Sequence, residues 1–145
     1  MDAERAFTLL NLVVMPWWAV WIVAPRSRLA ARSASHGAVF VGLATVYAVL
    51  LGATFASSEV AGFDFESMRT GLSQPVGFLA GWTHYLCFDL FVGAWILRES
   101  RRLDVEPRAY LFFALMAGPI GLGAFLVRRA VRLRGLGQIG ESDLV

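Results

Sequence analysis

The residues best suited to chemistry in this 145-residue chain are His84 and Asp89, inside an apolar segment from about Val76 to Leu97. Such a segment is long enough to cross a bilayer, which takes about 20 mostly apolar residues. An aspartate at the centre of a membrane helix costs about 2.5–3.5 kcal/mol on insertion scales, so neighbouring helices are expected to cover it. A carboxyl group and an imidazole that are shielded from water are suited to donating and removing protons.

His84 and Asp89 cannot bond to each other, because five residues at about 100° each place them about 140° apart around a helix. Each therefore needs a partner on another helix. Two interpretations stay open. In the first, both act on a lipid-soluble substrate, Asp89 as acid or charge stabiliser and His84 as base or orienting donor. In the second, both bond to Tyr47, Asn11 or unpaired carbonyls and only lock the helices together.

The composition predicts that the chain lies in a membrane. Hydrophobic residues make up 57% and charged residues 17%, with a mean hydropathy of +0.60. The apolar residues form four blocks, which predict one transmembrane domain over residues 1–134 and a disordered tail at 135–145. The expected spans are about 7–24, 38–56, 76–98 and 109–128.

A short interfacial helix is expected between the second and third spans. Asp64 is suited to cap its start, and Phe65, Met68 and Leu72 recur at helical spacing. The predicted fold class is therefore all-α: an integral membrane four-helix bundle with a short interfacial helix between spans 2 and 3.

Prolines interrupt two of the expected spans. Pro16 and Pro119 lack an N–H group, so the carbonyls of Leu12 and Leu115, four residues earlier, lose their helical donors. A carbonyl freed inside a membrane needs another donor. In the third span, the Gly77–Gly81 spacing allows a second helix to approach closely.

The charges also fit a membrane protein. All thirteen basic residues are arginines, and most flank the apolar blocks, as topology signals and contact with anionic lipid require; nucleic acid binding is not predicted. The first and third connections hold seven arginines and are expected to face the cytoplasm, which puts both termini outside the cell membrane. The four arginines at 128–134 disagree, because four crossings return the tail to the outer side.

No metal or cofactor is predicted. The second histidine, His36, lies in a polar connection, and no spacing typical of metal ligands is present. The single cysteine, Cys87, excludes an internal disulfide.

Three groups of residues carry a resemblance to a known protein family. They are Asn11 with Pro16, Trp18 and Pro25; His84 with the run Phe88 to Gly93 (FDLFVG) and Trp95-Ile96; and Phe112 with Gly118-Pro119-Ile120-Gly121. The set resembles the plant abscisic-acid-deficient-4-like (neoxanthin-synthesis) family of small four-span membrane proteins, over about 11–126. The lysine-free composition resembles that of a GC-rich bacterium and so indicates the bacterial branch. An arginine that commonly follows the glycine of the second group is Ala94 here.

The plant members are needed to make the allenic xanthophyll neoxanthin from violaxanthin. The resemblance therefore implies a protein that binds, and rearranges or isomerises, a carotenoid or related isoprenoid, with membrane lipid as its other partner. The catalytic candidates are Asp89 and His84, and the substrate-binding candidates are Asn11, Trp18, Tyr47, Tyr85, Trp95 and Pro119. The alternative is a non-catalytic subunit or assembly factor, and a homo-oligomer or larger membrane complex stays open.

Overall fold

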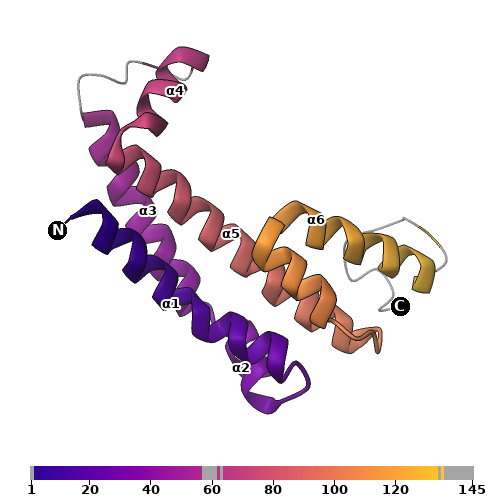
Figure 1. Cartoon of the computed structure of the whole chain (residues 1–145). Coiled ribbons are helices and arrows are strands. Elements are labelled where there is room, and N and C mark those ends of the chain that lie inside the picture. The colour runs from indigo at the N-terminus through magenta and orange to yellow at the C-terminus, as the bar shows by residue number, and fades with distance from the viewer. Residues whose placement is uncertain (1, 57–61, 63, 134, 136–145) are drawn as a thin grey trace.

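The computed structural model describes residues 2–56, 62, 64–133 and 135, and all regular elements in this part are helices (Figure 1). Four of them are long and apolar enough to cross a membrane: α1 (Ala3–Val23), α3 (Ala38–Ala56), α5 (Pro75–Arg102) and α6 (Arg108–Leu133). Two are short: α2 (Arg28–Ser35) and α4 (Phe65–Ser73). The predicted all-α membrane bundle is confirmed. The tail predicted at 135–145 lies outside the described residues, apart from Gly135.

The two short helices begin at side-chain caps. Asp64 accepts from the Ser67 amide at 3.1 Å and starts α4 where the sequence predicted it. Ser27 accepts from the Ala30 amide at 3.0 Å and starts α2. The sequence indicated only a polar connection between the first two spans, so α2 was not predicted.

Helix α5 is the centre of the fold, because it contacts each of the other five helices. Gly93 on α5 makes room for α1, since a Cβ atom at Gly93 would lie 2.6 Å from the ring of Trp18. Trp18 and Trp21 pack edge to face at 5.7 Å, and the indole of Trp21 donates to the Ser33 hydroxyl of α2 at 2.9 Å. The glycine of the FDLFVG run therefore serves helix packing.

Helix α6 folds back on itself (Figure 1). Its backbone leaves the helical region at Ala117, with φ −155° and ψ 60°. The rings of Tyr110 and Phe125 lie 5.4 Å apart, whereas fifteen residues of unbroken helix would separate them by about 22 Å. A Cβ atom at Gly121 would lie 2.2 Å from the Ala114 amide nitrogen. The two halves of α6 therefore pack side by side.

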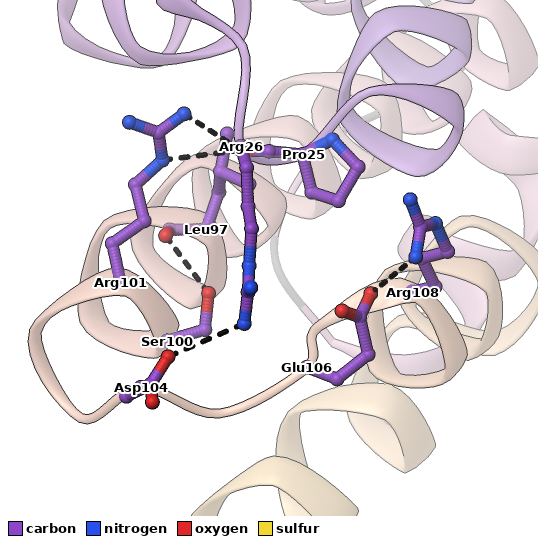
Figure 2. A network of polar contacts seen from close by, with 8 residues as sticks. All are labelled: Pro25, Arg26, Leu97, Ser100, Arg101, Asp104, Glu106 and Arg108. Carbon is purple, nitrogen blue, oxygen red and sulfur yellow. Dashed lines mark hydrogen bonds and ion pairs between the residues drawn. The ribbon is translucent and has the colours of Figure 1, made fainter.

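Arginines close the end of the bundle where α1, α2 and α5 meet (Figure 2). The guanidinium of Arg101 donates to the Pro25 carbonyl at 2.8 and 3.1 Å and to the Ser27 carbonyl at 2.6 Å. Arg108 donates to the Ile22 carbonyl at 3.1 Å. Carbonyls at and just beyond the end of α1 thus receive donors from α5 and α6.

Candidate functional site

An apolar cavity of about 460 Å³ lies between α3, α4 and α5. Its volume falls in the usual range for small-molecule sites. Helix α3 contributes Tyr47, Leu51, Thr54 and Phe55; α4 contributes Ser67, Met68, Gly71 and Leu72; and α5 contributes Gly77, Phe78, Ala80, Gly81, Trp82, His84 and Tyr85.

Close packing of α4 on α5 forms one side of the cavity. A Cβ atom at Gly77 would lie 1.9 Å from the carbonyl oxygen of Gly71 and 3.3 Å from a side-chain carbon of Thr54. Only a glycine at Gly77 permits this approach, as the Gly77–Gly81 spacing predicted. Met68 and Leu72, two of the residues that predicted α4, line the cavity.

Three of the predicted site residues gather at one place in the cavity wall. The ring of His84 lies 5.5 Å from that of Tyr47 on α3 and 6.2 Å from that of Tyr85. Tyr47 is half-buried, while His84 and Tyr85 are exposed on the protein surface. None of the three side chains has a hydrogen bond within the described part of the chain. Their polar atoms are therefore available to a ligand.

Asp89 does not line this cavity. Its half-buried side chain packs against the fold of α6, where a Cβ atom at Gly118 would lie 2.0 Å from Oδ1 and 2.8 Å from Cγ. The carboxylate has no hydrogen bond or ion pair with any residue that the structure describes. His84 and Asp89 therefore face different neighbours, as their angular separation predicted.

The remaining predicted substrate-binding residues lie away from the cavity. Asn11 donates to the Phe7 carbonyl of its own helix at 2.8 Å. Trp18 is 2% exposed in the core, and Trp95 packs edge to face against Phe125 at 5.5 Å. Pro119 is exposed beside the break of α6. Asn11, Trp18 and Trp95 therefore have contacts within the bundle, and none of the four residues borders the cavity.

Sequence reasoning missed most of the apolar cavity wall, including Leu51 and Thr54 on α3. An uninterrupted apolar helix gives no signal for the face that borders a cavity. Within the described ranges, no three His, Cys, Asp or Glu side chains are grouped as metal ligands would be.

A bundle of four long apolar helices, two of which enclose a cavity together with the short helix α4, defines a multi-pass helical membrane protein. The chain belongs to the ABA4-like family, because the family model described as ABA DEFICIENT 4-like matches residues 5–125. It is similar to the chloroplastic protein ABA DEFICIENT 4 of Arabidopsis thaliana, with 20% identity over 137 residues, 89% of this chain. The matched part covers 62% of that relative, less than two thirds of its length. No solved structure matches the chain.

Proposed function

We propose that the chain is a membrane protein that binds a carotenoid or related isoprenoid, and that the cavity between α3, α4 and α5 receives one end of this ligand. Membership of the ABA4-like family supports the ligand class. The observation that carries the site is an apolar cavity of about 460 Å³ with four unpaired polar side chains in its wall: Tyr47, Trp82, His84 and Tyr85.

The polar side chains favour an oxygen-bearing ligand. Tyr47 lies halfway along α3 and His84 lies well inside α5, at depths where a bilayer offers no water to hydrogen-bond. A polar group left unpaired there costs free energy, and a hydroxyl or epoxide oxygen of a xanthophyll ring would supply the partner. A hydrocarbon without oxygen would leave these groups unpaired.

The chain of such a ligand extends beyond the cavity. Tyr85, Phe88 and Phe91 recur every three residues along α5 and are 63%, 58% and 52% exposed. The ring of Phe88 stacks on that of His84 at 4.5 Å, which makes the stripe continuous with the cavity wall. A conjugated polyene lying along this stripe would pack against aromatic faces.

We also propose that the protein isomerises the bound ligand. Moving a proton within one molecule needs a base and an acid, and His84 and Asp89 are the candidates. His84 lines the cavity and Asp89 does not, so the two act together only if the bound ligand touches both faces of α5. The alternative is a non-catalytic membrane subunit, in which Asp89 acts through its packing against Gly118 and not through hydrogen bonds, since it has none within the described residues.

The first experiment is extraction of pigment and lipid from purified protein, produced in cells that make xanthophylls. We expect a stoichiometric carotenoid, and recovery of phospholipid alone would contradict the proposal. Leu51→Trp fills the cavity from α3, whereas Val49→Trp adds the same side chain on the same helix at a position that is 66% exposed. Pigment should be lost from Leu51→Trp and retained by Val49→Trp.

A second experiment separates binding from chemistry. Asp89→Asn and His84→Gln keep the size of each side chain but change its proton chemistry. If the pair is catalytic, both variants accumulate normally, retain pigment and fail to convert it. If Asp89 is structural, Asp89→Asn lowers accumulation in the membrane and leaves the pigment composition of the remaining protein unchanged.

A further inference from the structure

Each half of α6 is too short to cross a membrane. Nine helical residues, Arg108–Met116, rise about 13 Å, and the hydrocarbon core of a bilayer is about 30 Å thick. After the break at Ala117, ten residues from Gly118 to Val127 descend about 15 Å before Arg128. Each half thus matches about half of the apolar layer.

The direction of the second half follows from its partners on α5. Three pairs lie in the same order along both segments: Asp89 beside Gly118, Trp95 beside Phe125 at 5.5 Å, and Glu99 bonded to Arg129 at 2.7 Å. The second half of α6 therefore runs parallel to α5. The first half runs the opposite way, since a short turn joins it to the end of α5 (Figure 1).

We infer that α6 is a re-entrant hairpin, which enters the membrane to mid-depth and leaves on the side where it entered. The chain then crosses three times, with α1, α3 and α5. The C-terminal side of α6 lies with the first and third connections, and the start of α1 lies on the opposite side.

The charges support this path. In a four-crossing chain, Arg128, Arg129 and Arg132 would lie across the membrane from the seven arginines of the first and third connections. The hairpin puts all of these arginines on one side, which the positive-inside rule assigns to the cytoplasm. The expectation that both termini lie outside assumed four crossings. With the hairpin, the start of α1 lies outside and the end of α6 lies on the cytoplasmic side.

The tip of the hairpin has the features that a break in the membrane requires. Irregular backbone at this depth is tolerated where protein covers it, and Asp89 covers Gly118. Pro119 follows the break at the start of the second half, where its missing N–H group removes no helical bond. The positive end of that half-helix faces the Asp89 carboxylate, as in other membrane proteins with broken helices.

The test is cysteine labelling of the full chain in a Cys87→Ser background. Single cysteines replace Ser35 at the end of α2, Ser73 at the end of α4 and Gly135 after α6, all exposed positions. A membrane-impermeant maleimide is applied to spheroplasts and to inside-out vesicles, and detergent-solubilised protein shows that each thiol can react.

Gly135→Cys and Ser35→Cys should be labelled only in inside-out vesicles, and Ser73→Cys only in spheroplasts. Labelling of Gly135→Cys together with Ser73→Cys, or from both sides, would overturn the hairpin. The path of α6 does not depend on the ligand proposed above, so absence of pigment leaves this result unaffected.

A second measurement tests the fold of α6 directly. A short bifunctional thiol reagent should cross-link Tyr110→Cys to Phe125→Cys within one chain, because their rings lie 5.4 Å apart. An unbroken helix would hold these positions about 22 Å apart and give no cross-link. Absence of the cross-link in folded protein, with both thiols reactive, would overturn the hairpin.

Discussion

The carboxylate of Asp89 on α5 lies directly against Gly118 at the break of α6, where an added Cβ atom would meet Oδ1 at 2.0 Å. This contact joins two sequence groups that carry the family resemblance, the FDLFVG run and the Gly118-Pro119-Ile120-Gly121 run. The two runs form one structural unit, in which a glycine makes room for an acidic side chain.

Gly118→Ala is expected to displace the Asp89 carboxylate and to destabilise the protein by about 1 kcal/mol, at the low end for overpacking, because a side chain can rotate away from the new methyl group. Gly123→Ala, in the same half of α6, is the matched control, since no atom lies within 4 Å of its Cβ position. Thermal unfolding in detergent measures both. Equal midpoints for the two variants would contradict the contact.

The hydropathy of the sequence was sufficient to predict the four apolar helices, and the Asp64 cap with the helical spacing of the apolar residues after it was sufficient to predict α4. The fold of α6 was not predictable in this way, because a hydropathy window gives the same value for one long helix and for two short ones. Gly118 and Pro119 marked the place of the break. The backbone at Ala117, and the contact of Tyr110 with Phe125, were needed to establish it.

The candidate site was predictable only in part for a similar reason. Ionisable and hydroxyl groups at mid-depth identified His84 and Tyr47, which do meet in the structure. Helical geometry also separated His84 from Asp89. Which neighbour each would face depends on how α3 and α6 are rotated about their axes, and a single apolar sequence does not specify this rotation.

Gly77→Ala should separate α4 from α5 and open the cavity. Its methyl group would meet the Gly71 carbonyl oxygen at 1.9 Å and carbon at 2.8 Å, and a backbone cannot move aside as a side chain can. Gly52→Ala on α3, with no atom within 4 Å, is the control. We expect faster hydrogen exchange in α4 and loss of bound pigment for Gly77→Ala only. Unchanged exchange in α4 would refute the packing of the two helices.

Acid should loosen α4 through its cap. Hydrogen bonds from the Ser67 hydroxyl at 2.7 Å, and then from its backbone amide, lower the pKa of Asp64 below its ordinary value of 3.8. Because the folded pKa is the lower one, the charged cap contributes stability above pH 3.8, and this contribution is lost as the pH falls through the folded pKa.

Asp64→Asn keeps an oxygen that can cap the helix but does not titrate. At each pH, the hydrogen-exchange rate of α4 in the native chain is divided by the rate in Asp64→Asn. This ratio should rise below pH 3.8 and stay level above it. A ratio that does not change with pH would show that the cap has no linked proton.

An ion pair between Arg129 and Glu99 holds the end of α6, and a variant at the neighbouring Arg128 serves as its control. Arg129 Nε donates to Glu99 Oε1 at 2.7 Å, and the two side chains are 6% and 13% exposed. Breaking a buried pair of this kind costs about 3–5 kcal/mol, because one charge stays buried without its partner. Arg102 also bonds to Glu99, so the loss from Arg129→Ala should lie toward the lower value. Arg128→Ala removes the same charge from the neighbouring exposed position, which controls for effects on topology.

We expect Arg129→Ala to lower the midpoint of thermal unfolding and to reduce the Tyr110→Cys to Phe125→Cys cross-link, while Arg128→Ala changes neither. The physical reason is that the ion pair of Arg129 with Glu99 holds the second half of α6 along α5, beside apolar contacts such as that of Phe125 with Trp95. If both variants lower the midpoint equally, the effect comes from total charge, and the ion pair does not hold the hairpin.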